Sequence, residues 1–566
     1  MQKPKSFRPW QPEQTTLLPP SPSDWLSDDH QVYFLLDLLD ELDLSQVLIP
    51  AQAKDPRGEK GFDPRMMTLL LLYGYCVGIV SSRRIERACY EDLAFRVLTG
   101  NQQPDHSRIS EFRRRNLEAL SDLFVQILRL CQKAGMVSLG HVALDGTKVQ
   151  GNASKRKAMS HERMLKAEKQ LEQEINALMR RAEILDAQED QRYGKSNRGS
   201  DLPEELRRRQ DRLARIHQAR LEMEAETAAA AARQRLEEAE EARAKAVAAQ
   251  KSDAAAAEQA ELNRKAEAAA AKAKAARETA NKAAESAGVE PPDLEPLAAD
   301  GMPRRGLARK ADGTPTNKTQ RNFTDPDSHL MQSGGTYLQG YNCQLAVDSD
   351  HQVIVAVGVS NQPPDVEHLE PMLERIATSA GALPDVMTLD AGYWSEDNAK
   401  TCADQGIDAY IATGRLPHGQ PLPPKRGPLP KDADAKTRMA RKLRSKKGSR
   451  IYAQRKAIVE PVNGQIKEAR DLRRFLLRGI EKVNGEWHLI AATHNLLKLF
   501  RFQRSQQQAL ARAARDGSAP CRLAWSPEGK SRSGSTHGWR SPCQAGCCSI
   551  DNKLLARTNR SINPIS

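Results

Sequence analysis

Apolar residues recur at helical spacing through much of the first 140 residues. The segments 33–42, 66–77 and 117–130 place them three and four positions apart, which predicts helices with one buried face. Two more helices are predicted over 82–98 and 107–117, with Asp105 as a candidate N-cap of the second. Residues 31–140 are therefore expected to form a helical domain, after a polar, proline-rich extended arm over 1–30.

Short apolar runs that end at turn residues predict strands further along the chain. The run 141–144 leads into Asp145-Gly146-Thr147 and reads as a strand, although its length alone does not exclude a helix. Strands at 337–347 and 352–359 flank a hairpin signal. Two more, at 386–390 and 409–413, alternate with helices at 365–380 and 395–405. A loop over 414–450 and a long helix over about 452–500 follow. This order predicts a mixed α/β layer fold built from residues 141–154 and 320–500.

Residues 155–300 have the composition of a helical insertion. Apolar side chains spaced as in a coiled-coil seam are Met164, Ala167, Leu171, Ile175, Leu178, Ala182 and Leu185. From 226 to 286 the chain is mostly Ala, Glu, Lys, Arg and Gln, which favours helix but leaves little to bury. The prediction is a protruding helical, low-complexity coiled-coil arm that ends at Gly288 and the following proline pair. Binding of a partner by this arm is the alternative.

Composition and charge narrow the class of protein. With 566 residues the chain can hold several domains, and 86 Lys and Arg against 73 Asp and Glu give a net charge of +13. Such a charge favours a polyanionic partner, while a merely soluble basic protein is the alternative. No apolar run reaches the ~18 residues of a membrane span. The nine scattered cysteines suit a reducing cytoplasm. Residues 505–566 are expected to be a disordered tail, and their four cysteines lack a standard zinc spacing.

Three acidic residues are candidates for a metal site. Asp145 and Asp390 each end an apolar run, so they would emerge side by side if the two strands are neighbours, and a packed helix could add Glu460. Carboxylates suit Mg²⁺, and two such ions can activate a nucleophile and stabilise the leaving oxygen of a phosphodiester. Taken singly, each carboxylate is more often a helix cap or a surface charge.

Five segments resemble the IS1182-type branch of the IS4/IS5-like DDE transposases. They read HVALDGTKVQGNAS (141–154), NFTDPDS (322–328), QGYNCQ (339–344), LDAGY (389–393) and RKAIVEPVNGQIK (455–467). With the helical N-terminal portion, the likeness covers about 7–155 and 320–500. It implies an RNase H-like catalytic core in which Asp145, Asp390 and Glu460 form the metal-binding DDE triad.

The residues around Glu460 also fit this resemblance. Lys456, Glu460 and Lys467 share one helical face by spacing, although the proline at 461 should kink or restart the helix. The resemblance matches Glu460 and Lys467 to a Glu and a Lys seven positions apart, and Lys467 is assigned to a DNA phosphate near the cut site. It also matches Tyr452 and Arg455. Arg455 lies five positions before Glu460, where many relatives have four. For Lys456 and Lys467, exposed ion pairing is the alternative.

Two basic regions suggest how DNA is bound. The segment 425–450, directly before the helix of Glu460, is crowded with Lys and Arg and could follow a DNA strand or be a solvated loop. The helix over 107–117 could dock in a major groove. It carries the candidate DNA-binding residues Arg108, Arg113, Arg114 and Arg115. The alternative is a helical bundle with a basic outer face.

Together these features predict a DDE transposase that cleaves and joins double-stranded DNA at terminal inverted repeats and in target DNA. It would use two Mg²⁺ ions, with Mn²⁺ as an alternative, and no nucleotide cofactor. The resemblance implies a homodimer in the DNA complex, in the bacterial cytoplasm near the nucleoid. A metal-dependent nuclease on the same fold and a decayed transposase that only binds DNA are the alternatives.

Overall fold

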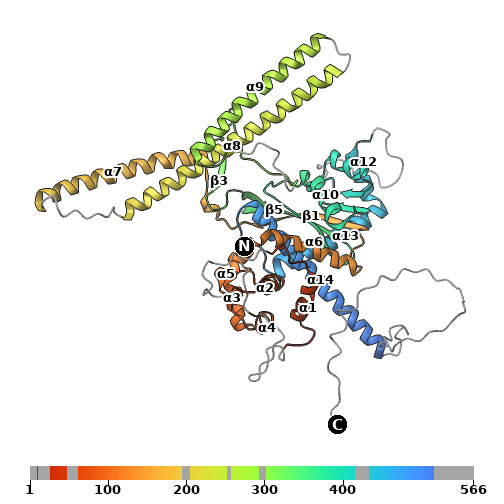
Figure 1. Cartoon of the computed structure of the whole chain (residues 1–566). Helices are drawn as coiled ribbons and strands as arrows, with labels where there is room; N and C mark the ends of the chain where they lie inside the picture. Colours follow the sequence, from red (N-terminus) through yellow and green to blue (C-terminus); the bar gives the residue numbers. More distant parts are fainter. Residues whose placement is uncertain are drawn as a thin grey trace, which may run out of the picture.

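The structure is a computed structural model that describes residue 9 and residues 26–47, 61–193, 204–251, 256–291, 301–414 and 433–515. Figure 1 shows a group of short N-terminal helices, a sheet flanked by helices, and long helices that project from the sheet as an arm. The predictions for most of residues 1–30, for residues 516–566 with their cysteines, and for the basic residues of 415–432 lie outside these described residues.

The sheet has six strands, with β1 (His141–Gln150) at its centre. β1 pairs antiparallel with β5 (Thr336–Asp348) on one side and parallel with β7 (Val386–Leu389) on the other, and β7 pairs parallel with β8 (Asp408–Ile411). β4 (His329–Ser333) and β6 (Ile354–Ser360) pair antiparallel with different parts of β5. β2 (Ala158–Ser160) and β3 (Gln320–Asn322) form a separate two-stranded sheet.

The predicted strands are present, but β1 is longer than expected. The sequence ends this strand at Asp145, whereas its pairing with β5 continues to Gln150. Asp145 therefore lies in the middle of a strand, where hydrogen bonds on the β5 side hold its backbone. The helices between the strands agree with the predicted order: η4 (Val366–His368) and α10 (Leu369–Ala380) precede β7, and η5 (Ala391–Tyr393) and α11 (Glu396–Asp404) precede β8.

The N-terminal helices are α1 (Gln31–Leu38), η2 (Leu39–Glu41), α2 (Pro64–Val77), α3 (Ser82–Glu91), α4 (Leu93–Leu98), α5 (His106–Arg115) and α6 (Leu117–Lys133). One helix was expected over 82–98, but Asp92 separates α3 from α4 because its carboxylate caps the backbone N–H groups of Ala94 and Phe95. The predicted cap Asp105 is confirmed, since it accepts from Ser107 N and Arg108 N.

The C-terminal helices differ most from the sequence prediction. α12 (Ala435–Arg444) and the start of α13 (Lys446–Gly464) occupy part of the expected loop, because Asp434 and Ser445 cap them. The expected single helix over 452–500 is divided into α13, the π-helical turn η6 (Gln465–Ala469) and α14 (Ile480–Arg515). α14 includes residues 505–515, which were expected to be disordered.

The proline at 461 does not interrupt α13, contrary to the prediction. A proline leaves the carbonyl four residues earlier without its helical donor. Here that carbonyl belongs to Ala457, and it accepts a hydrogen bond of 2.8 Å from Gln352 Nε2 on the β5–β6 turn. A side chain from the sheet therefore supplies the donor that the proline removes.

The arm consists of α7 (His161–Tyr193), α8 (Glu204–Lys251) and α9 (Ala256–Ala287). It begins directly after the short turn η3 (Lys155–Lys157) and β2. α8 and α9 run side by side (Figure 1) along a seam that includes Ala228, Ala232 and Ala280. On α7, Met164 and Leu171 of the predicted seam join a small core with α8. The side chains of Ala182 and Leu185 lie outside the described residues. α9 ends before Gly288, as predicted, and this glycine has a φ of 66°.

Buried polar contacts connect the N-terminal helices with the C-terminal part of the chain. Glu486 of α14 is fully buried, and it accepts hydrogen bonds from Tyr75 of α2 and from the backbone of Leu476 and Leu477. Arg113 of α5 donates to the same Tyr75 hydroxyl. Within the described residues no single helix could span a membrane, and only the bent pair α2–α3 meets that test when joined.

Candidate active site

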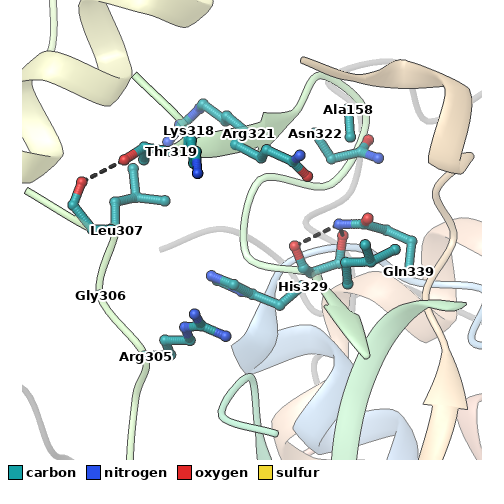
Figure 2. Close-up of a pocket in the computed structure, with 14 residues that line it drawn as sticks. Ala158, Arg305, Gly306, Leu307, Lys318, Thr319, Arg321, Asn322, His329 and Gln339 are labelled. Carbon is teal, nitrogen blue, oxygen red and sulfur yellow. Dashed lines mark hydrogen bonds between the residues drawn. The ribbon is translucent and has the colours of Figure 1, made fainter. Parts of the chain in front are cut away.

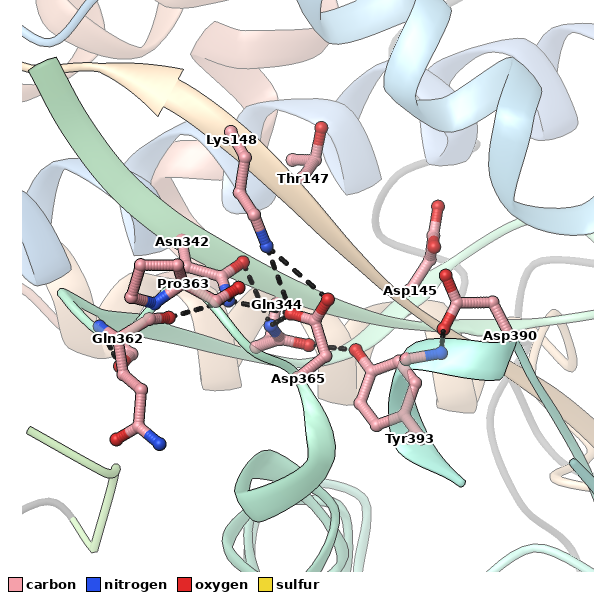
Figure 3. Close-up of polar contacts among 12 residues, drawn as sticks. Asp145, Thr147, Lys148, Asn342, Gln344, Gln362, Pro363, Asp365, Asp390 and Tyr393 are labelled. Carbon is pink, nitrogen blue, oxygen red and sulfur yellow. Dashed lines mark hydrogen bonds and ion pairs between the residues drawn. The ribbon is translucent and has the colours of Figure 1, made fainter. Parts of the chain in front are cut away.

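Asp145 and Asp390 lie next to each other at the centre of the sheet. β1 and β7 are parallel, and Leu144 is in register with Leu389. The next residue on each strand is the aspartate, and neighbouring strands are about 4.8 Å apart. Figure 3 shows the two carboxylates side by side. The Asp390 side chain is held by the backbone two residues later, because its Oδ1 accepts from Gly392 N at 2.8 Å and caps η5. The strand pairing thus brings together two acids that are 245 positions apart in the sequence.

Asp145 is largely buried and lies near two other carboxylates. Burial raises the pKa of Asp145 to about 6, Arg455 opposes that rise, and the carboxylates of Asp390 and Asp365 add to it. Arg455 Nη1 lies 3.4 Å from Asp145 Oδ1, and Asn463 Nδ2 donates to Oδ2 over 3.2 Å. A cation placed between the carboxylates would offset both the burial and the repulsion.

Three predicted residues of α13 and η6 lie near these aspartates. Arg455 contacts Asp145 directly. Burial raises the pKa of Tyr452, and the nearby charges of Asp390 and Asp145 add to that rise. Lys467 Nζ donates to Thr147 Oγ1 at 2.5 Å and to the Lys148 carbonyl at 2.9 Å. Burial lowers the pKa of Lys467. Lys456 is exposed on the outer side of α13.

Glu460 is exposed on α13, and the structure does not gather it with the two aspartates. Across the described ranges, no group of three or more Asp, Glu, His or Cys side chains has the arrangement of a metal site. Asp145 and Asp390 are hard oxygen donors, as Mg²⁺ and Mn²⁺ require, so this pair fits a divalent cation. The part of Glu460 in the predicted triad stays a prediction.

A third carboxylate beside the pair, Asp365, was missed by the sequence analysis. Its carboxylate accepts from Asn342 at 2.7 Å, from Gln344 at 3.0 Å and from Lys148 at 3.2 Å, as Figure 3 shows. Gln344 in turn accepts from the hydroxyl of Tyr393. Asn342 and Gln344 belong to the motif QGYNCQ, which was a signal that this region matters, but nothing in the sequence connected the motif to Asp365.

Asp365 also packs against the glycines that follow the two aspartates. A Cβ atom at Gly146 would lie 2.5 Å from Asp365 Oδ1, and one at Gly392 would lie 3.2 Å from Asp365 Oδ2. Side chains at these positions would have to displace the Asp365 carboxylate. The absence of a side chain at Gly146 and Gly392 therefore allows the Asp365 carboxylate to approach the strands of Asp145 and Asp390 from the side opposite α13.

The four arginines predicted to bind DNA on α5 have different environments. Arg113 is 3% exposed and donates to the Val80 carbonyl, Ser82 Oγ and the Tyr75 hydroxyl. Its prediction as a DNA contact is wrong in this structure, because its guanidinium is used inside the helical domain. Arg108, Arg114 and Arg115 are exposed. Arg115 pairs with Glu111 at 2.7 Å, and Arg108 lies 3.9 Å from Asp105.

The basic region before Glu460 is helical where it is described. Lys442 of α12 pairs with Asp408 at 2.6 Å, which attaches α12 to β8. The exposed basic residues of α12 and the start of α13 are Lys436, Arg438, Lys446, Lys447 and Arg450. They lie on the helix that carries Arg455 and on the one before it, so positive charge continues along the chain toward the aspartate pair.

Comparison with known proteins gives two family matches. Residues 20–115 match the Transposase domain (DUF772), and residues 309–496 match the Transposase DDE domain. No curated protein and no solved structure gives a significant match. The second range contains Asp365, Asp390 and Glu460. Asp145 precedes it, on the strand that completes the centre of the same sheet.

These matches agree with the architecture. A DDE domain implies an RNase H-like α/β core, and the observed mixed sheet with flanking helices is of that class. DDE transposases bind DNA, carry out phosphoryl transfer on it and generally use divalent metal ions. The two transposase domain matches and the motifs around the aspartate pair are consistent with an IS1182-type DDE transposase.

Proposed function

We propose that this protein cleaves DNA at the terminal inverted repeats of an insertion sequence and transfers the freed strands to target DNA. The observation that carries the proposal is the pair of Asp145 and Asp390 on the adjacent parallel strands β1 and β7. Two carboxylates on adjacent strands could hold divalent cations, and these cations, with Arg455 beside Asp145, would offset the negative charge of a phosphodiester during attack.

The metal site is proposed to consist of Asp145, Asp390 and Glu460. Glu460 is three residues, or about one helical turn, from Asn463, whose side chain already contacts Asp145. The backbone of Glu460 therefore lies about one helical turn from the contact with Asp145, and its side chain is exposed. Two Mg²⁺ or Mn²⁺ ions, when bound, would supply activation of a water or 3′-hydroxyl and stabilisation of the leaving oxygen.

The chain's own cations are proposed to position the DNA. Arg455 has a planar guanidinium, which can bind a phosphate with two parallel hydrogen bonds. It lies against Asp145, so a phosphate bound there would be next to the carboxylates. Lys467, on the neighbouring turn, would bind a flanking phosphate after exchanging its contacts with β1. Lys456 and Tyr452 are proposed as further DNA contacts on the same helix.

Recognition of the element ends is proposed for the N-terminal helices. Arg108, Arg114 and Arg115 of α5 are exposed, whereas Arg113 is buried and is not included. Joining two DNA ends requires two active sites in one complex, so a homodimer on DNA is part of the proposal. The α7–α9 arm is available for contacts between the subunits.

The decisive experiment is strand transfer by the purified protein on labelled element-end DNA with Mg²⁺. Asp145→Ala, Asp390→Ala and Glu460→Ala should each abolish product but retain DNA binding. Asp404→Ala, an exposed acid at the end of α11, is the matched control and should react like the parent. Cleavage without joining would indicate a nuclease instead. An inert parent that still binds its correct ends would indicate a decayed transposase, and activity in Glu460→Ala would remove Glu460 from the triad.

DNA recognition by α5 is tested separately by measuring the affinity for terminal-repeat DNA against unrelated DNA. Arg108→Ala combined with Arg114→Ala should weaken binding and reduce the preference for the repeat. Arg207→Ala combined with Arg208→Ala, which removes the same charge from the arm, is the control. Equal affinity and preference in both double variants would exclude α5 as the recognition helix.

A further inference from the structure

A cavity of about 240 Å³ lies where the arm joins the sheet. Its walls come from the segments 305–308, 318–322 and 328–330, with Ala158 of β2 and Gln339 of β5 completing the lining. Figure 2 shows Arg305, Lys318 and His329 around this space. None of the residues assigned above to catalysis or DNA binding lines it.

The lining carries positive charge without acidic residues. Arg305 and Lys318 are exposed at the cavity, and no Asp or Glu is among the described residues that line it. A third cation, Arg321, is already neutralised by Glu222 and Glu226 of α8. Arg305 and Lys318 have no acidic partner in the described parts of the chain. Two unneutralised cations that face one cavity favour an anionic ligand.

The walls of the cavity are fixed by internal hydrogen bonds. The Arg305 backbone N–H donates to Asn361 Oδ1 at 2.7 Å, and Thr319 Oγ1 donates to the Ala308 carbonyl at 2.5 Å. Gln339 Nε2 donates to the Ser328 carbonyl at 2.7 Å, which attaches the third wall to β5. The backbone around the two cations is therefore held in place before any ligand binds.

The strand register gives the distance from the cavity to the aspartate pair. Asp145 is opposite Leu345 on β5, and Gln339 lies six residues before Leu345 on that strand. At about 3.3 Å per residue this separation is roughly 20 Å. Residues an even number apart on a strand face the same side of the sheet, so Gln339 shares a face with Leu345 and hence with Asp145. About 20 Å corresponds to about six phosphates of one B-DNA strand, counted along the duplex axis.

We propose that this cavity binds a backbone phosphate of the element-end DNA, with Arg305 and Lys318 as its cationic ligands, about six base pairs from the phosphodiester at the aspartate pair. Such a site holds the duplex at a second point and fixes which phosphate reaches Asp145 and Asp390. It contacts the DNA backbone and carries no sequence information of its own. The inference rests on the proposed function, because it needs DNA at the aspartate pair.

The first test is the salt dependence of DNA binding by the full-length protein, measured by fluorescence anisotropy on a short element-end duplex. Arg305→Ala combined with Lys318→Ala should weaken binding about tenfold and make the slope of log K against log salt less steep by about 0.9 for one lost phosphate contact. Arg243→Ala combined with Lys245→Ala removes one Arg and one Lys from exposed positions of α8 and should leave the slope unchanged.

The second test locates the phosphate. Single methylphosphonate substitutions along the duplex should identify one position, about six base pairs from the cleaved bond, that weakens binding of the parent but not of the Arg305/Lys318 double variant. Sensitivity of both proteins at that position would overturn the proposal, as would an unchanged salt slope in the double variant. Displacement of the duplex by micromolar inorganic phosphate would instead indicate a small-anion site. A parent protein that fails to bind element ends at all would refute the proposed function rather than the cavity alone.

Discussion

Replacing Asp145 with Asn should abolish DNA cleavage and, at neutral pH, make the protein more stable. The Asp145 side chain is 17% exposed, and burial together with two nearby carboxylates raises its pKa from 3.8 to about 6. Its folded-state pKa is thus above its unfolded-state value. The stability that this group contributes is fully present below pH 4 and is lost as the pH rises through 6. Ionised Asp145 therefore destabilises the metal-free protein at pH 7 and above.

The size of the effect follows from the two pKa values. A difference of about two pH units corresponds to roughly 3 kcal/mol. Asn has nearly the same shape and does not titrate, and its side-chain oxygen can still accept from Asn463. Loss of the contact with Arg455 offsets part of the gain. We expect the Asn variant to be about 1–3 kcal/mol more stable than the parent at pH 8, and equally stable near pH 4.

The assay is urea denaturation of parent and variant in EDTA at several pH values from 4 to 8. The difference in the free energy of unfolding should grow between pH 4 and 6 and then level off. Addition of Mg²⁺ at pH 8 should stabilise the parent but not the variant, since a ligand that binds the folded state adds to its stability. A variant that is less stable than the parent at pH 8, or a difference that does not change through pH 6, would refute the electrostatic reasoning.

Three further substitutions test other contacts. Gly146→Ala should cost about 1–3 kcal/mol of stability and reduce cleavage more than DNA binding, because its Cβ would meet Asp365 Oδ1 at 2.5 Å. Gly140→Ala meets only an ordinary contact of 3.5 Å and is the control, so equal activity of the two variants would refute this role of Asp365. Glu486→Ala should lower the free energy of unfolding by about 3–5 kcal/mol by leaving buried donors unpaired, with a smaller loss in Glu486→Gln; equal losses in urea denaturation would contradict this. Ala280→Leu should separate α8 from α9 and speed proteolysis of the arm, and an unchanged digestion pattern would show that the alanine seam tolerates bulk.

The hydrogen bonds and the ion pair of Asp365 link β5 to the strand that carries Asp145. Asn342 and Gln344 lie on β5 and point to the side of the sheet on which Asp365 is bound. Lys148, three residues after Asp145 on β1, completes the ion pair. β1 and β5 are thus connected by a carboxylate that also contacts the turn after Asp390. A change in these contacts would therefore shift the positions of both Asp145 and Asp390, although Asn342, Gln344 and Lys148 do not contact either aspartate directly.

Several features of this protein were determined by the sequence itself. Periodicity and turn signals are local properties, and they located the helices of residues 31–133, the β5–β6 hairpin and the helical arm with its end at Gly288. Asp105 caps α5 as its position predicts, because capping involves only the next few residues. The motifs around Asp145 and Asp390 resemble those of DDE transposases, and the two transposase domain matches agree with this resemblance.

Tertiary structure decided the features that depend on residues far apart in the chain. The continuation of β1 past Asp145 required pairing with β5, and α13 remains helical at the proline because Gln352 supplies a donor from the sheet. Arg113 is adjacent to the exposed Arg114 in the sequence, yet its contacts with Tyr75 and Val80 place it inside the fold. Asp365 has no local signature, since its partners come from β1 and β5. Hydrophobic spacing specifies which face of an element is buried, but not which distant polar groups meet there, and that pairing determines the geometry of the site.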